Sequence, residues 1–537
     1  MKRRKLESVG AAALFLLCAA MTAGYLIAGY GAYLDADMAS ELALARHLAD
    51  EGTLISSTWL YSTEVRVLST QLVFTPLMAL LGGSWRAVRT VGCLILQAML
   101  AASAYFCGRS LGAKKRWALA FAGLSISACS VVYSQMILIG AYYVPHAVLT
   151  NLCVGMAAQI MQMKKGGRRM GVFAALTALC ALMGASSIRY PFCATLPMAA
   201  AGVWAYLFPT EELAPRTGRQ KKETALVVFV CMVSVAGFAV GQKILGRVCA
   251  YDAARYGGVR LAAFTSADMA QMIQQALGGL ARLMGYSEHS ILLSAHGLVS
   301  VGALMLPAAA AVLLARALKK AKREGNALLR FGALTLAMSA VMTALSFVLL
   351  EDLYINRYWI PLMTLGAPVM AACLSGEENA PLRRMSAALF AGVVLLSSAM
   401  QIKSTMDEPQ IMERDYARAD YLEENGMTFG YATFWNANVV TELTSGKVEV
   451  VSISIDENAE GQGVPHTGQW LEKIEDIGMN HPNESVFILL SPQEAERLKD
   501  FLALSGAEKT YEDDGLGVYR IESQRAFFDA AEKLDTP

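Results

Sequence analysis

Long apolar runs separated by short polar connections fill the first 402 residues of the chain. Such runs are long enough to cross the ~30 Å hydrocarbon core of a bilayer as α-helices. The pattern therefore predicts a polytopic α-helical membrane protein with about eleven transmembrane helices. The predicted spans cover residues 9–30, 88–107, 116–133, 143–162, 170–187, 190–208, 224–245, 291–315, 328–350, 358–375 and 385–402.

Two further segments carry apolar residues but are not counted as spans. Residues 67–83 are long enough to cross the bilayer, yet counting them would move every later basic loop to the opposite side. We therefore expect a helix that dips into the outer interface. In the loop at 246–290, apolar residues recur at near-helical spacing among polar ones, which predicts an amphipathic helix on the membrane surface.

Basic residues mark one side of the membrane. Those of the connecting loops all fall on the side of Lys2 to Lys5, which the positive-inside rule assigns to the cytoplasm. They lie near residues 109–116, 164–169, 216–222, 316–323 and 383–384. This distribution predicts a cytoplasmic N-terminus, with the loops at 31–87 and 246–290 and the C-terminal tail on the extracytoplasmic side.

The chain changes character near residue 403, where it becomes polar and acidic with short β-rich runs. We therefore expect a transmembrane domain at 1–402 and a small soluble extracytoplasmic α/β domain at 403–537. Strand-like runs lie at 428–431, 448–455, 485–490 and 517–521, and helical patterns at 417–424, 435–443 and 492–504.

The composition excludes several classes of protein. With 55% hydrophobic and only 17% charged residues, the chain is not an ordinary soluble enzyme. Its net charge of +1 gives no global basic field, so no nucleic-acid partner is expected. The ten cysteines lie within or beside apolar stretches, which predicts neither a disulfide framework nor a Cys-x-x-Cys metal site. No P-loop or HExxH motif supports ATP-driven transport or zinc proteolysis.

Two acidic residues, Asp35 and Asp37, follow the first span directly, with Glu41 one turn onward. Carboxylates held at the membrane surface can act as a general base or bind a divalent cation such as Mg²⁺ or Mn²⁺. The alternative is structural: Asp37 caps a helix over residues 38–50 while Asp35 is solvated. The two interpretations are compatible if one Asp caps and the other reacts.

Positive charge is sparse on the outer side, and the arginines found there can hold a lipid phosphate. Arg66 lies in the first outer loop, Arg189 in a short turn between two spans, and Arg357 just before a span that contains proline. Contact with ordinary lipid headgroups is the alternative. The same two interpretations apply to Arg46, His47, Arg86 and Arg89.

Other polar side chains gather at the predicted outer surface. Asn356 and Tyr358 flank Arg357 in a run at 351–361 that also holds two acidic residues. Tyr142 and His146 stand at the outer mouth of the span at 143–162. The histidine can be a ligand, a proton carrier or an interfacial polar residue, and the tyrosine can belong to an aromatic belt.

The order of these motifs resembles the C-fold (GT-C) membrane glycosyltransferases, which include protein O-mannosyltransferases and aminoarabinose transferases. The shared features are an acidic motif after the first span, an interfacial helix and an arginine before the second, an Asn-Arg-Tyr-x-x-Pro-like run and an exposed C-terminal domain. The resemblance implies transfer of a sugar, with inversion, from a polyprenyl phosphate-linked donor to an acceptor outside the cytoplasm. The acceptor can be a glycan, a lipid or a protein.

The resemblance also implies roles for individual residues. Asp35, followed by Glu41 and Ala43 at the family's offsets, is implied as the base in preference to Asp37. The donor phosphate would meet Arg357 and also Arg66 or Arg189. Further substrate contacts are expected from Glu41, His146, Tyr142, Asn356 and Tyr358. The second outer loop lacks the acidic residue common in the family, which leaves the divalent cation open and His146 as a substitute.

Two other functions remain compatible with the sequence. A transporter or flippase of lipid-linked sugars would use the same outer surface without bond cleavage. A non-enzymatic envelope assembly protein would use the tail to bind a partner. Sugar transfer requires that the acid after the first helix and Arg357 share a single hydrated chamber at the outer membrane surface.

Overall fold

The computed structural model describes residues 2–30, 32–209, 218–251, 265–349, 355–407, 412–468 and 471–535. Among these residues, nine helical segments are long and apolar enough to cross a membrane, and each coincides with a predicted span. They are α1 (Lys2–Gly29), α4 (Trp85–Ser110), α7 (Val144–Gln162), α8 (Gly167–Ser186), α10 (Gly218–Leu245), α12 (Ala295–Arg323), α13 (Ala327–Leu349), η4 (Asn356–Trp359) with α14 (Ile360–Gly376), and α15 (Ala380–Asp407). The protein is a multi-pass integral membrane protein.

The other two predicted spans are shorter in the structure. The segment at 190–208 forms a π-helical turn, η2 (Pro191–Thr195), continued by α9 (Leu196–Leu207). The segment at 116–133 is interrupted: α5 (Lys115–Ser125) ends early, and a single turn α6 (Val131–Tyr133) leads into the π-helix η1 (Ser134–Ile139). The expectation of one continuous helix at 116–133 is therefore wrong.

Hydroxyl groups of neighbouring helices stabilise this interruption. Thr22 of α1 donates a hydrogen bond to the carbonyl oxygen of Ile126 at 2.7 Å. Ser397 of α15 donates to the carbonyl of Cys129 at 2.6 Å, and Ser398 donates to that of Ala128 at 3.2 Å. Backbone groups away from water need such partners. The backbone carbonyls at the interruption therefore have hydrogen-bond partners, and only the folded bundle brings these side chains near them.

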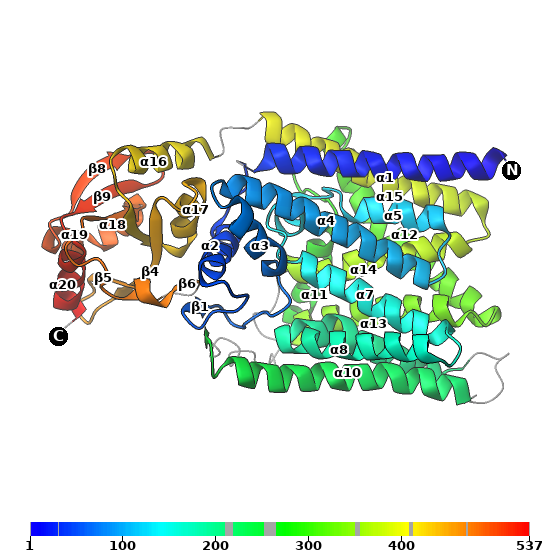
Figure 1. Ribbon diagram of the computed structural model, residues 1–537. Helices are drawn as coiled ribbons and strands as arrows, with labels where there is room; N and C mark the ends of the chain where they lie inside the picture. Colours follow the sequence, from blue (N-terminus) through cyan, green and yellow to red (C-terminus); the bar gives the residue numbers. More distant parts are fainter. Residues whose placement is uncertain are drawn as a thin grey trace.

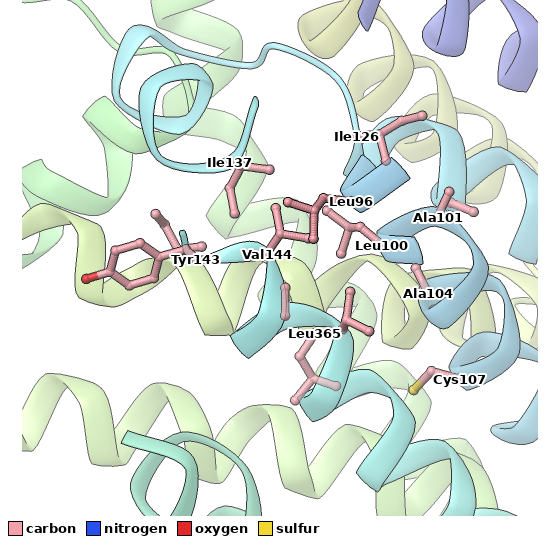
Figure 2. Close-up of a cluster of buried hydrophobic side chains, with 14 of the residues drawn as sticks. Leu96, Leu100, Ala101, Ala104, Cys107, Ile126, Ile137, Tyr143, Val144 and Leu365 are labelled. Carbon is pink, nitrogen blue, oxygen red and sulfur yellow. The ribbon is translucent and has the colours of Figure 1, made fainter. Parts of the chain in front are cut away.

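Apolar contacts between helices build the bundle core (Figure 2). Leu96 and Ala104 of α4 meet Val144 of α7 and Leu365 of α14 in one cluster of buried side chains. Small residues let helices pack closely, which matters where the hydrophobic effect no longer drives association. Figure 2 shows Tyr143 at the edge of this cluster, with its hydroxyl directed away from the apolar side chains.

Short elements cover the end of the bundle that faces the C-terminal domain, opposite the N-terminus (Figure 1). They are α2 (Ala36–Glu51), β1 (Trp59–Tyr61), α3 (Gln71–Leu81), β2 (Ala250–Tyr251) and α11 (Ser266–Leu283). The helices α3 and α11 confirm those expected at 67–83 and within 246–290, although residues 252–264 lie outside the described residues. Trp359 holds α11 by donating its indole N–H to the carbonyl of Ala276 at 3.0 Å.

The C-terminal domain is built on a six-stranded mixed sheet in the order β5-β4-β3-β7-β9-β8. Its strands are β3 (Phe429–Thr433), β4 (Glu449–Glu457), β5 (Gly463–His466), β7 (Val486–Leu490), β8 (Glu508–Glu512) and β9 (Gly517–Ile521). Its helices are α16 (Glu413–Glu424), α17 (Phe434–Leu443), η6 (Ile474–Ile477), α18 (Pro492–Arg497), α19 (Lys499–Leu504) and α20 (Gln524–Asp535). The four predicted strands and three helical regions are confirmed. The two strands that the sequence missed, β5 and β8, are the edges of the sheet.

Two contacts join this domain to the rest of the chain. Strand β6 (Glu472–Lys473) pairs with β1, which lies between α2 and α3, in a small sheet ordered β2-β1-β6. In addition, Glu442 of α17 accepts hydrogen bonds from Arg89 of α4, at 2.5 Å from Nε and 2.6 Å from Nη2. Both side chains are almost fully buried. Arg89 therefore neither holds a lipid phosphate nor contacts headgroups, the two interpretations that the sequence left open, but belongs to a buried ion pair.

We expect Glu442→Ala to destabilise the protein by about 3–5 kcal/mol, because it leaves the Arg89 guanidinium buried without a counter-charge. The double variant Arg89→Met/Glu442→Leu should recover much of that loss, since no uncompensated charge remains. Denaturant unfolding in detergent micelles measures both. Lys499→Ala, which breaks an exposed pair with Glu496, is the control and should cost less than ~1 kcal/mol. Equal losses in the single and double variants would contradict this account.

Candidate functional site

Asp35 caps the helix that follows it. Its backbone is extended, and its side-chain oxygen Oδ1 accepts a hydrogen bond from the Met38 amide at 2.8 Å. The helix α2 begins at Ala36, so the sequence interpretation in which Asp37 is the cap is wrong. Burial raises the pKa of Asp35, the Met38 amide lowers it, and the neighbouring charge of Asp37 raises it further. A carboxylate with a raised pKa is a stronger base than an ordinary aspartate.

Asp37 contacts Arg357, which precedes α14. The Asp37 Oδ2 and the Arg357 Nη1 lie 3.6 Å apart, and each side chain is about a third exposed. Asp37 and Arg357 lie far apart in the sequence, with most of the transmembrane helices between them. The fold brings them together at the end of the bundle that faces the C-terminal domain. The sequence predicts an acid after the first helix beside the late guanidinium, and Asp37, rather than Asp35, makes this contact. The single chamber that would enclose both groups stays a prediction.

The other two predicted arginines, Arg66 and Arg189, gather around one buried acid, Glu64. The Nε atoms of Arg66 and Arg189 lie 3.5 and 4.0 Å from Glu64 Oε1. Ser187 donates a hydrogen bond to the same oxygen at 2.7 Å. Sequence reasoning missed Glu64, although an acid two residues before an outer-loop arginine was a usable signal. One carboxylate thus positions two guanidinium groups.

Tyrosine rings connect Arg189 to the rest of the cluster. Its Nη1 donates to the Tyr143 hydroxyl at 3.3 Å. Its guanidinium also lies over the rings of Tyr143 and Tyr358, 5.8 and 5.5 Å from their centroids. Such contacts stabilise a cation without neutralising its charge. The sequence analysis predicted Tyr358 for the site, but it named Tyr142 and not Tyr143.

That neighbour, Tyr142, stacks obliquely against Tyr143 at 5.5 Å and donates its hydroxyl to the Met136 sulfur at 2.7 Å. Burial raises the pKa of Tyr142, and the negative charges of Asp35 and Asp37 raise it further. Tyr142 is therefore a neutral side chain on the acidic side of the site.

His146 is buried behind the tyrosines. Its ring stacks on Tyr190 with centroids 4.5 Å apart and is only 4% exposed. Neither ring nitrogen has a hydrogen-bond partner among the described residues. Its ring centroid also lies 5.8 Å from that of Tyr143, the tyrosine that contacts Arg189.

Glu41 belongs to the scaffold. It accepts hydrogen bonds from the Thr70 hydroxyl and, at 3.0 Å, from the Gln71 side chain, and so ties α2 to the start of α3. Asn356 opens the short helix η4 directly before Arg357. The acidic part of that run, residues 351–354, lies outside the described residues.

The site has two electrostatic halves. Asp35 and Asp37 form an acidic edge at the start of α2, and Arg66, Arg189 and Arg357 supply three cations, with Glu64 among them. Three guanidinium groups can bind a phosphate through charge-assisted hydrogen bonds. Within the described residues, no three His, Cys, Asp or Glu side chains are grouped to hold a metal ion, so the divalent cation stays a prediction.

Solved structures share this architecture. ArnT from Cupriavidus metallidurans bound to undecaprenyl phosphate matches with a TM-score of 0.57 and 12% identity, over 95% of this chain and 98% of that one. The chain has the C-fold of the membrane glycosyltransferases. The apo state of the same ArnT gives a TM-score of 0.55 at 12% identity, over 98% of this chain and 99% of that one.

A third structure, the Archaeoglobus fulgidus oligosaccharyltransferase tethered with an acceptor peptide, aligns with a TM-score of 0.48 and 10% identity, over 96% of this chain and 74% of that one. No family model matches the sequence. No curated protein matches it either. The two ArnT structures confirm the C-fold expected from the order of motifs, and at 12% identity they show the fold alone.

The cap geometry predicts different stabilities for two substitutions of Asp35. Asp35→Ala removes the acceptor for the Met38 amide and should lower the free energy of unfolding by about 1 kcal/mol, whereas Asn caps a helix as well as Asp and Asp35→Asn should be nearly neutral. Denaturant unfolding of both variants measures the difference. Asp37→Ala, which removes no cap, is the matched control, and a loss as large as that of Asp35→Ala would contradict the assignment.

Proposed function

We propose that the protein is a glycosyltransferase that moves a sugar from a polyprenyl phosphate-linked donor to an acceptor hydroxyl on the extracytoplasmic side of the membrane. The observation that carries the proposal is the contact of Asp37 with Arg357, which sets an acidic edge against a cluster of arginines at one end of a C-fold bundle. Sugar transfer from a lipid phosphate needs both halves: a base for the acceptor and cations for the departing phosphate.

In this reaction the acceptor hydroxyl attacks the anomeric carbon of the donor. Asp35 takes the hydroxyl proton, and the bond between the anomeric carbon and the phosphate oxygen breaks. The bonding electrons leave with that oxygen, so the second product is the polyprenyl phosphate. Arg357, with Arg189 and Arg66, stabilises the negative charge that grows on it. Inversion at the anomeric carbon is expected from the family resemblance.

The two aspartates have different parts in the proposal. Asp35 is the base, because burial raises its pKa and the Met38 amide fixes its orientation. Asp37 orients Arg357 for the donor phosphate. A metal ion has no assigned step.

An apolar groove in the bundle suits a lipid-linked donor. About 280 Å³ in volume, it is lined by helices α5 and α11 to α15, including Leu362, Met363 and Gly366 of α14. Leu362 follows Arg357 by five residues, roughly 8 Å along a helix. A phosphate at Arg357 would therefore lie within reach of an apolar channel for the chain attached to it. The ArnT structure with undecaprenyl phosphate adds support for a polyprenyl phosphate partner.

The proposal is tested by turnover of labelled polyprenyl phosphate sugars by the purified protein. Asp35→Asn should lower kcat at least 100-fold, since general base catalysis contributes about 10²–10⁴ in rate. The asparagine retains the helix cap, so this variant separates catalysis from folding. Full transfer by Asp35→Asn would exclude Asp35 as the base, and full transfer by Asp37→Asn as well would exclude both aspartates from the reaction. Absence of donor consumption would instead favour a transporter of lipid-linked sugars or an envelope assembly protein.

Arg357→Gln should weaken donor binding about 10- to 100-fold, because it removes a charge-assisted contact to the phosphate. Equilibrium binding of a polyprenyl phosphate measures the loss without turnover. Arg86→Gln is the matched control, since Arg86 lies over the Tyr30 ring, 5.4 Å from its centroid, and outside the proposed phosphate contacts. Unchanged affinity in Arg357→Gln would place the phosphate elsewhere.

A further inference from the structure

A second pocket lies between the first outer loop and the C-terminal domain, apart from the aspartates and arginines of the candidate site. Its volume of about 320 Å³ is at the lower end of the range for small-molecule sites. Helix α2 forms one side with Ala43, Arg46 and Asp50. Helix α17 and strands β4 and β6 form the other, with Asn438, Thr441, Glu449 and Glu472 among the lining residues.

Three buried polar atoms around this pocket have no hydrogen-bond partner among the described residues. They are the indole nitrogens of Trp59 and Trp85 and the Oε1 atom of Glu472. All three side chains line the pocket, and the two tryptophans are each only 2% exposed. A buried indole N–H normally finds a partner, so three unsatisfied groups around one space indicate a ligand that supplies them.

The charges of the pocket balance one another. Arg46 pairs with Asp50 at 2.7 Å, and Lys473 pairs with Glu449 at 2.5 Å and approaches Asp476 at 3.7 Å. These charged side chains therefore already have partners of opposite charge within the pocket. Lys447 also has one, Glu423, which lies outside the pocket. A strongly charged ligand would find no free opposite charge here.

Glu472 adds a neutral hydrogen-bonding group. Ser452 of β4 donates to its Oε2 from both the backbone N–H and the hydroxyl, at 3.1 and 2.9 Å. Burial raises the pKa of Glu472 to about 8, the Ser452 contacts lower it, and the nearby Asp476 raises it. A carboxyl group with its pKa raised in this way is mostly protonated at neutral pH, and in that form it can both donate and accept a hydrogen bond.

We propose that this pocket binds one or two uncharged sugar units of the acceptor, an assignment that rests on the proposed function. Neutral hydroxyl groups match the indole N–H groups, the amide of Asn438 and the Glu472 carboxyl. The pocket and the candidate site share helix α2: Arg46 follows Asp37 by nine residues, roughly 13 Å along the helix. An acceptor held at Trp59 and Trp85 would extend over a few sugar units to reach Asp35.

The test is calorimetric titration of the purified full-length protein with three neutral disaccharides: maltose, cellobiose and N,N′-diacetylchitobiose. At least one should bind at pH 6.5. Trp85→Phe, which keeps a ring but removes the N–H, and Asn438→Ala should each raise its Kd at least tenfold. Asn436→Ala is the matched control on the same helix, because its side chain bonds Thr433 and does not line the pocket. Unfolding temperatures check that each variant is folded.

A pH arm tests the part of Glu472. Ionisation of this carboxyl removes its proton and with it a hydrogen-bond donor, so binding by the wild type should weaken more than binding by Glu472→Gln between pH 6.5 and pH 9.5. The groups that face it, Tyr431, Ser452, Asp476, Lys473 and Glu449, are unchanged in this variant. Burial raises the pKa of Asp476 to about 7, so its titration falls in the same range and acts on both proteins alike. Equal pH dependence of the two proteins would overturn the role of Glu472.

The binding assay needs no donor, so its failure is distinct from failure of the proposed function. Donor turnover without binding of any of the three disaccharides, or binding that Trp85→Phe and Asn438→Ala leave intact, would overturn the pocket assignment alone. Disaccharide binding without any donor turnover would overturn the acceptor role. A peptide that binds in this pocket in place of the sugars would also overturn it.

Discussion

The arrangement of the end of the bundle that faces the C-terminal domain depends on the buried guanidinium of Arg89. It forms two hydrogen bonds with Glu442 and donates to the carbonyls of Met38 at 2.7 Å and Ile139 at 3.1 Å. It therefore joins the second long helix, the C-terminal domain, the start of α2 and the end of the π-helix after the broken span. A charge in such a place is stable only when all its partners are present. Met38 lies directly after Asp37, so the same contacts fix the acidic edge of the site.

The membrane helices and the main strands could be predicted because each depends on a local pattern, a long apolar run or a short β-rich segment. The interruption at 126–130 could not, since Ile126, Ala128 and Cys129 are as compatible with a span as their neighbours. Their carbonyls accept hydrogen bonds from Thr22, Ser398 and Ser397, which lie far away in the chain. The edge strand β8 was missed because it is largely exposed and has no buried face to mark it. The edge strand β5 is buried, but it has only four residues, and its glycine and proline are rare in strands.

Part of the candidate site could also be predicted. Dense polar motifs beside apolar spans contain Asp35, Asp37 and Arg357. Charged side chains close to the membrane interior are energetically costly, so their presence indicates a functional site. Glu64 and Tyr143 were missed because their importance lies in partners more than 40 residues away: Arg189 in both cases. Arg89 was misinterpreted for the same reason, since its partner lies 353 residues onward. Motifs identified which residues carry charge, while the fold decides which charges meet.

The proposed reaction links donor binding to the strength of the base. Arg357 contacts Asp37 in the structure, and Asp37 lies beside Asp35, whose pKa it raises. A donor phosphate that binds Arg357 competes with Asp37 for the guanidinium and brings negative charge of its own. Both effects disfavour the ionised form of Asp35 and increase its affinity for a proton. The Met38 amide, which holds one carboxylate oxygen, opposes this shift and preserves the orientation of the other. The base would thus take the acceptor proton most readily when the donor is in place.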